Sequence, residues 1–251
     1  MMALSRNEIK LIKSLQNKKE REEHRLFTAE GAKLCEELLS AKNFSIDRIY
    51  YTESAEPISA SHASWIKISG SDMERISSLV NPPGILAVVH FPEPEKEDDQ
   101  TNENLILALD EIRDPGNLGT IIRTADWFGI KTVLTSETSV DLYNPKVIQA
   151  SMGAVFRIRL QAVNLPERLN RLKSQGFKIL GADMNGKSLY SFEFPEKSVL
   201  VMGSESHGIS AGIHALLDTR ITIPSFGKTE SLNVGIAAAV IISHYKMSAS
   251  K

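Results

Sequence analysis

A buried strand that runs into a polar turn and an amphipathic helix constrains the fold of this chain more than any other feature. Residues 105–109 (LILAL) form a short apolar run, which is typical of a parallel strand buried on both faces. Residues 114–117 (DPGN) predict a turn. Apolar residues then recur at helical spacing until Gly129: Leu118, Ile121, Ile122, Ala125 and Phe128. Asn117 and Arg123 are therefore expected at the end of the strand and in the following helix, where open α/β sheets bind ligands. The alternative is that Asn117 only caps the helix and that Arg123 is only a solvated charge.

Composition excludes several classes of protein. With 42% hydrophobic and 24% charged residues, the 251-residue chain has the composition of an ordinary soluble protein. Its net charge of -2 gives no global attraction to nucleic acid, so RNA or DNA binding needs a local basic patch. The single cysteine, Cys35, excludes an intrachain disulfide and a cysteine-cluster metal site, and we expect it to be buried. No metal site is predicted. Since no apolar run is long enough to span a bilayer and the first residues lack the apolar core of a signal peptide, we predict a cytoplasmic protein without membrane association.

The chain is predicted to divide at residues 92–104 (PEPEKEDDQTNEN), which are acidic, contain proline and lack apolar periodicity, as linkers do. Residues 1–91 read as a small α/β domain, with a helix near 30–41, strands near 47–52 and 65–68, a short helix near 72–79 and a closing strand at 84–91. In residues 105–251, helical stretches alternate with strands near 105–109, 131–135, 156–160, 177–182, 198–203 and 220–223. The second domain is therefore predicted to be an α/β fold with a mostly parallel sheet and helices on both faces.

A basic patch lies near the N-terminus. Between Arg6 and Arg25 the chain has seven basic and four acidic residues. Four of the basic residues are candidates for contacts with nucleic-acid phosphates: Lys18, Lys19, Arg21 and Arg25. The same residues are also compatible with a solvated helix face whose charges pair with the interleaved glutamates.

Two further polar clusters follow strands of the second domain. Residues 202–209 (MGSESHGI) predict a tight glycine turn that presents Glu205, and they match neither a nucleophile elbow nor a dinucleotide-binding fingerprint. Residues 223–239 (IPSFGKTESLNVGIAAA) predict a polar loop and a helix that begins near Ser231, with Ser231 as N-cap and Asn233 in the first turn. Together with the strand, turn and helix of residues 105–129, these clusters are expected to bring five side chains to one edge of the sheet: Asn117, Arg123, Glu205, Ser231 and Asn233.

Three motifs in this order, at residues 114–125, 202–209 and 223–239, resemble those of the SpoU/TrmH RNA 2′-O-ribose methyltransferases of the SPOUT class. Residues 13–31 resemble the start of that family's N-terminal substrate-binding domain. The resemblance implies a deep trefoil knot in the C-terminal domain, homodimers, and S-adenosyl-L-methionine held by backbone groups at Gly203, Ile223 and Leu232. It assigns the family's active-site positions to the five side chains named above, and it favours RNA contacts at Lys18 to Arg25. The chain departs from the family at Gly235, where a serine is common.

The resemblance implies transfer of a methyl group to a ribose 2′-hydroxyl in RNA, with ribosomal RNA favoured over transfer RNA. Asn117, Ser231 and Asn233 suit the orientation of reactants. Arg123 is either the base or a clamp on the neighbouring phosphate, and Glu205 fixes the loop or orients Arg123. Three alternatives stay open: a tRNA ribose methyltransferase, a knotted enzyme that methylates a base, and a non-catalytic RNA-binding or ribosome-assembly module.

Overall fold

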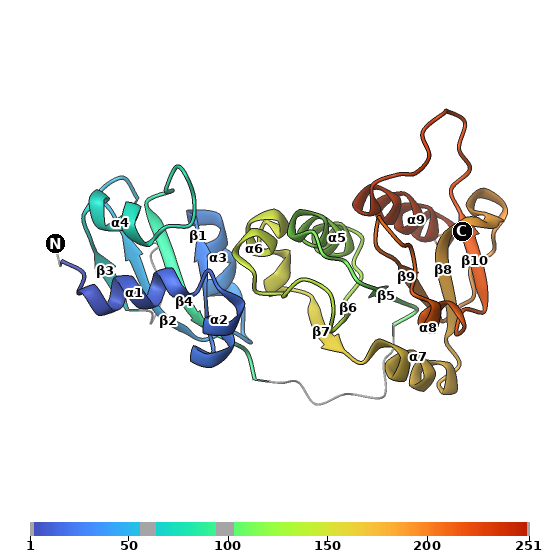
Figure 1. Ribbon diagram of the computed structural model, residues 1–251, viewed down its shortest axis with the longest axis horizontal. Helices are drawn as coiled ribbons and strands as arrows, with labels where there is room; N and C mark the ends of the chain where they lie inside the picture. The colour runs from blue at the N-terminus through green and yellow to red at the C-terminus, as the bar shows by residue number, and fades with distance from the viewer. Residues whose placement is uncertain (1–2, 56–63, 94–102, 250–251) are drawn as a thin grey trace. The chain divides into compact units, whose positions relative to one another are not determined.

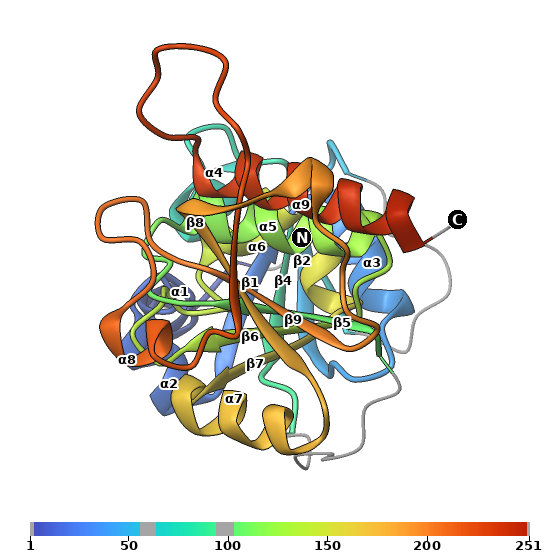
Figure 2. The ribbon, with the colours of Figure 1, turned by 90° about the vertical axis from the view of Figure 1, so that its right-hand side faces the viewer.

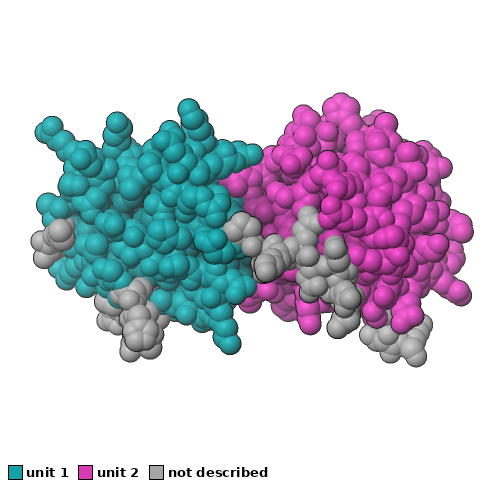
Figure 3. Space-filling view, turned by 90° about the horizontal axis from the view of Figure 1, so that it is seen from below, with its two compact units in different colours: residues 1–96, 143–156 teal, residues 97–142, 157–251 magenta. Residues whose placement is uncertain are grey.

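A computed structural model describes residues 3–55, 64–93 and 103–249 of the chain (Figure 1). The chain forms two compact units, one of residues 1–96 with 143–156 and one of residues 97–142 with 157–251 (Figure 3). Most of the predicted linker, residues 94–102, lies outside the described residues. The first unit also takes in residues 143–156, which the sequence analysis placed in the second domain.

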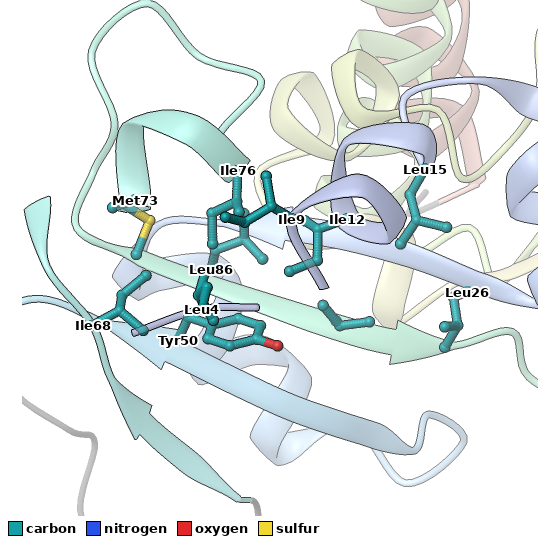
Figure 4. Packing of buried hydrophobic residues seen from close by; sticks show 11 residues of the cluster. Leu4, Ile9, Ile12, Leu15, Leu26, Tyr50, Ile68, Met73, Ile76 and Leu86 are labelled. Atoms are coloured by element: carbon teal, nitrogen blue, oxygen red, sulfur yellow. The ribbon is translucent and has the colours of Figure 1, made fainter. Parts of the chain in front are cut away.

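The first unit is built on a four-stranded sheet in the order β1-β4-β2-β3. Its strands are β1 (Leu26–Glu30), β2 (Ile46–Tyr51), β3 (Trp65–Lys67) and β4 (Ile85–His90). Strand β4 pairs antiparallel with β1 and β2, and β3 adds parallel to β2 at the edge. Helices α1 (Arg6–Ser14) and α4 (Gly70–Ile76) cover one face with a core of Leu4, Ile9, Ile12, Leu15, Leu26, Tyr50, Ile68, Met73, Ile76, Leu86 and Val88 (Figure 4).

The described residues of this unit also form helices α2 (Lys18–His24), α3 (Ala32–Ser40) and α6 (Pro145–Ser151), the last followed by the 3₁₀ turn η1 (Ala154–Phe156). Cys35 of α3 is fully buried, as predicted. The segment 143–156 joins the unit because the ring of Tyr143 stacks on Phe27, with centroids 4.8 Å apart, and the Gln149 side chain donates to the Glu30 carbonyl at 2.7 Å. Burial of aromatic area and a paired amide both favour this attachment.

The second unit contains a six-stranded, wholly parallel sheet in the order β10-β8-β9-β5-β6-β7. Its strands are β5 (Leu105–Leu109), β6 (Thr132–Ser136), β7 (Arg159–Val163), β8 (Lys178–Ser188), β9 (Ser198–Met202) and β10 (Thr219–Thr222). Every residue of the neighbouring strands β5 and β9 is buried, as expected for central strands of a parallel sheet. The predicted α/β fold is confirmed. The strand predicted at 156–160 begins instead at Arg159, because residues 154–156 form η1.

Helices cover both faces of this sheet (Figure 2). Helices α5 (Pro115–Trp127) and α9 (Val234–Ala249) lie together on one face. Helices α7 (Leu165–Ser174) and α8 (Ala211–His214) lie on the other face, where Leu169, Leu172 and Ile213 pack on β5, β8 and β9. The short 3₁₀ turn η2 (Leu189–Ser191) follows β8. None of the helices in the described ranges is long and apolar enough to span a bilayer. Loops that follow β5, β9 and β10 carry the polar motifs.

Candidate active site

The turn between β5 and α5 leaves the Asn117 side chain available for contacts outside its own helix. Asp114 is the N-cap of α5, and its Oδ1 accepts the Asn117 backbone N–H at 2.8 Å. Pro115 follows in the first turn, where its missing N–H costs nothing. The interpretation of Asn117 as only an N-cap is therefore wrong, since Asp114 has that role.

The loop after β9 is closed on itself. Ser204 and Gly208 exchange two backbone hydrogen bonds of 3.0 and 2.9 Å, and Glu205 stands exposed within this loop. A Cβ on Gly203 would lie 2.2 Å from the carbonyl carbon of Gly208, so only glycine fits there. The loop therefore presents Glu205 on a tightly constrained backbone.

A buried carboxylate, Asp110, ties this loop to the end of β5. Asp110 is 3% exposed, and its Oδ2 accepts the backbone N–H of Ser210 at 2.7 Å. Its own N–H donates to the Met202 carbonyl at 2.8 Å. Asp110 is not among the residues predicted from the sequence; the available signal was an acidic residue directly after a buried apolar run, which needs a partner once it is buried.

Asn233 is the cap of helix α9. Its Oδ1 accepts the backbone N–H groups of Gly235 and Ile236 at 2.9 and 3.3 Å, and the helix begins at Val234. The predictions of a helix start near Ser231 and of Ser231 as N-cap are therefore wrong. Ser231 lies exposed in the preceding loop, and its side chain makes no hydrogen bond with any described residue.

Close packing of α9 on α5 accounts for glycine at position 235. A Cβ there would lie 3.3 Å from Thr120 Cγ2 of α5 and 3.2 Å from Asn233 Oδ1, tighter than ordinary contacts. The small residue thus permits the close approach of helix α5.

Three of the five predicted side chains form one hydrogen-bonded chain. Asn233 Nδ2 donates to Asn117 Oδ1 at 2.9 Å, and Asn117 Nδ2 donates to Glu205 Oε1. The capping bonds fix the Asn233 oxygen toward the helix, so its amide nitrogen must face Asn117, and the Asn117 nitrogen must then face the carboxylate. The network joins the motifs that follow β5, β9 and β10.

Arg123 and Ser231 lie outside this network. Arg123 is exposed on α5, and within the described part of the chain its guanidinium has neither a hydrogen-bond nor an ion-pair partner. Glu205 contacts Asn117, not Arg123, so the suggestion that Glu205 orients Arg123 has no support in this conformation. A guanidinium without an internal partner is available to an external anion.

The backbone of the loop between β10 and α9 is suited to holding a ligand. Residues 223–232 stand away from the sheet in both ribbon views (Figures 1 and 2) and make no backbone–backbone hydrogen bond to any described residue. Ile223 lies at the start of this loop, and Leu232, near its end, is 47% exposed. The Gly227 carbonyl accepts the Ser225 hydroxyl at 3.4 Å, and the other amides and carbonyls of the loop would suit a cofactor such as S-adenosylmethionine when it is bound mainly by main-chain groups.

The four predicted RNA-binding residues differ in their surroundings. Lys18, Lys19 and Arg25 are exposed, although Lys18 pairs with Glu22 at 3.7 Å and the Arg25 guanidinium lies over the Phe91 ring. Arg21 is 1% exposed, and its Nη1 donates to the Leu15 carbonyl at 2.7 Å. A buried guanidinium cannot reach a phosphate, so the prediction for Arg21 is corrected: it joins α2 to the end of α1.

The parallel sheet and the amide–carboxylate network place a polar site at the carboxyl ends of β5, β9 and β10, where α/β enzymes bind their ligands. The chain belongs to the SpoU rRNA methylase family, whose model matches residues 104–243, and residues 6–87 match the MRM3-like substrate binding domain. It is therefore an S-adenosylmethionine-dependent methyltransferase, and the resemblance inferred from the motifs is confirmed.

Similar proteins cover nearly the whole chain. The 23S rRNA (guanosine(2553)-2′-O)-methyltransferase RlmP of Bacillus subtilis is 31% identical over 93% of this chain and 94% of its own length. An RNA methyltransferase structure assigned to the TrmH family, from Porphyromonas gingivalis, is 38% identical, covers 98% of both chains and superposes with a TM-score of 0.88. An AdoMet-bound rRNA methyltransferase from Sinorhizobium meliloti is 25% identical over 98% of this chain and 97% of that chain, with a TM-score of 0.86.

Proposed function

We propose that this protein methylates a ribose 2′-hydroxyl in ribosomal RNA. The observation that carries the proposal is the chain of hydrogen bonds from Asn233 through Asn117 to Glu205, which joins the three motifs beside the unpaired backbone of residues 223–232. The relatives whose names state a target support rRNA over tRNA, since they include 23S rRNA 2′-O-methyltransferases.

The cofactor would be held by main-chain groups at Gly203, Ile223 and Leu232, as the family resemblance implies. When bound, S-adenosylmethionine supplies a methyl group on a sulfonium sulfur that a ribose oxygen can take in an in-line displacement. The closed loop at Gly203 would form one wall of the cofactor site, since Gly203 packs directly against the backbone of Gly208 and Ile209.

The amide network acts by orientation. Asn117 is held on one side by Asn233 and on the other by Glu205, so its amide is fixed before a substrate arrives. Pre-organised polar groups lower the entropy cost of aligning two reactants, an effect that contributes several kcal/mol. The free hydroxyl of Ser231 would add a further polar contact to the ribose.

Arg123 is assigned as the clamp on the phosphate next to the target ribose. A guanidinium carries its proton throughout the pH range in which proteins are folded, so it is a poor base but a strong anion ligand. Its lack of any internal partner in the described structure favours this assignment. The proton of the 2′-hydroxyl would then pass to a phosphate oxygen or to water.

We propose the finer features of the family for this chain as well. Residues 1–91 would bind the RNA, residues 92–104 would link the domains, and residues 105–251 would form a knotted catalytic domain. The protein would act as a homodimer in the cytoplasm. The match of residues 6–87 to a substrate binding domain supports the first of these assignments.

The decisive experiment is transfer of tritium from labelled S-adenosylmethionine into total RNA from cells that lack the gene, with wild type, Arg123→Ala and Arg171→Ala. Arg171 is the control because it is also an exposed helical arginine, but it lies on α7, which covers the opposite face of the sheet, and it pairs with Glu167 at 2.7 Å. We expect Arg123→Ala to retain cofactor affinity and to lose about 100-fold in transfer, and Arg171→Ala to match wild type. Alkaline hydrolysis should stop at the labelled nucleotide, since a 2′-O-methyl blocks cleavage. Transfer to a base, or no transfer by wild type, would refute the proposal.

A further inference from the structure

A row of cations lies along helix α1 in the first unit. Arg6, Lys10 and Lys13 are four and three residues apart, so they share one side of the helix. At 1.5 Å per residue the row is about 10 Å long. All three side chains are exposed, and none of them has an ion-pair or hydrogen-bond partner among the residues that the structure describes.

The acidic residues of the same region do not neutralise this row. Glu8, the only acid of α1, accepts the Ser5 hydroxyl at 2.7 Å and the Ser5 N–H at 3.0 Å, and it lies 3.4 Å from Arg48 Nη1. In α2, Glu22 pairs with Lys18 and Glu20 faces His24. Lys19 is left as another exposed cation without a partner in the described structure.

The row is presented on a rigid face. Ile9 and Ile12, on the buried side of α1, pack into the core of the unit (Figure 4). The buried Arg21 side chain donates to the Leu15 carbonyl at the end of α1, which holds α2 and therefore Lys19 in a fixed position relative to the row. The packing therefore fixes the spacing of the backbone positions that carry these cations, so no backbone rearrangement is needed when an anion binds.

We propose that Arg6, Lys10 and Lys13, extended by Lys19, form the surface of the first unit that binds the RNA sugar–phosphate backbone. The inference rests on the proposed function, because it takes RNA as the substrate. Unpaired, evenly spaced point charges suit phosphates, which position a nucleic acid without reading its sequence. The surface therefore positions the substrate, and recognition of the target nucleotide lies elsewhere.

Two triple variants test this surface. The row variant is Arg6→Gln, Lys10→Gln and Lys13→Gln. The control is Lys33→Gln, Lys42→Gln and Lys146→Gln, three exposed lysines of the same unit, so both variants lose three positive charges. Glutamine has nearly the helix propensity of lysine and arginine, and we expect both variants to unfold at the wild-type temperature.

The measurement is filter binding of labelled total ribosomal RNA from cells that lack the gene, over a range of salt concentration. Each lost phosphate contact lowers the slope of log affinity against log salt by about 0.7–0.9, so the row variant should lose about 2–3 units of slope. Between 50 and 200 mM salt the wild-type affinity should then fall about 20- to 40-fold more than that of the row variant. The control variant should keep the wild-type slope.

Equal slopes for the row variant and wild type, or an equal loss in the control, would overturn the inference. The row variant should also bind S-adenosylmethionine like wild type and raise the KM for RNA while kcat is unchanged. If wild type transfers no methyl group but the row variant still loses RNA affinity, the proposed function fails and the surface stands. If wild type transfers the methyl group but the row variant keeps the wild-type RNA affinity and salt dependence, the proposed function stands and the surface is wrong.

Discussion

The substitution Gly203→Ala tests whether the closed loop after β9 holds the cofactor. A Cβ at this position would lie 2.2 Å from the Gly208 carbonyl carbon, 2.3 Å from its oxygen and 2.3 Å from the Ile209 nitrogen. All three are backbone atoms, so no side-chain rotation can relieve the overlap. The loop must open, and the two hydrogen bonds between Ser204 and Gly208 must lengthen or break.

The cost follows from these contacts. An overpacked methyl group costs about 1–3 kcal/mol, and two backbone hydrogen bonds are worth about 1–3 kcal/mol together. The sheet below the loop keeps its pairing, so the variant should fold with an open loop. Binding of the cofactor must then close the loop again, and at about 1.4 kcal/mol per tenfold the affinity for S-adenosylmethionine should fall about 10- to 100-fold.

Calorimetric titration with S-adenosylmethionine and thermal unfolding should be measured together. Gly212→Ala is the matched control, because a Cβ at Gly212 in α8 meets no atom within 4 Å. This control should keep wild-type affinity. The reasoning is refuted if Gly203→Ala binds the cofactor as tightly as wild type, or if Gly212→Ala loses as much.

Three further predictions concern single residues. Asp110→Ala leaves the Ser210 N–H without its acceptor and should weaken the binding of S-adenosylmethionine about 10-fold in the same titration. Asp110→Asn keeps an acceptor oxygen and should bind nearly as tightly as wild type, so equal losses in the two variants would contradict the argument. Glu8→Gln should lower the free energy of unfolding by about 0.5–1 kcal/mol at neutral pH. The hydrogen bonds from Ser5 hold the pKa of Glu8 below its ordinary value of 4.5, so the wild-type advantage is complete above that value and is lost as pH falls through the lowered pKa. Urea unfolding should therefore show a smaller difference between the two proteins at about pH 3 than at pH 7, and a difference that does not shrink at acid pH would contradict this. Burial raises the pKa of the Cys35 thiol to about 12, so a thiol reagent at mildly alkaline pH should modify the protein only when it unfolds; rapid modification of the native protein would disprove this.

The second unit was largely predictable because its signals are local. A fully apolar run such as 105–109 is either a strand buried on both faces or a piece of buried helix, and the helix-breaking residues at 114–117 decide between them. The separate turn predicted at 114–117 was wrong, since Asp114 caps α5 and residues 115–117 already belong to that helix. The strand start predicted at residue 156 was wrong because η1 packs in the first unit, and no local sequence pattern indicates that long-range contact.

The candidate site was predictable in its residues and not in its contacts. Asn117 lies 88 positions from Glu205 and 116 from Asn233, so their hydrogen bonds depend on strand order. Ser231 and Asn233 are both good capping residues, and the choice between them depends on where the loop reaches α5. In the same way, a charge pattern cannot tell which arginine of residues 18–25 folds beneath α1; Arg21 does so because its guanidinium reaches the Leu15 carbonyl.

Asn233 serves two structures at once, since its oxygen caps α9 and its nitrogen holds Asn117. Fraying of the first turn of α9 on warming would withdraw the donor from Asn117 while most of the molecule is still folded. Activity should therefore be lost on heating before global unfolding begins, and the thermal limit of the enzyme would be set by one helix end. Substitutions that strengthen other parts of the fold would raise its melting temperature without extending its working range.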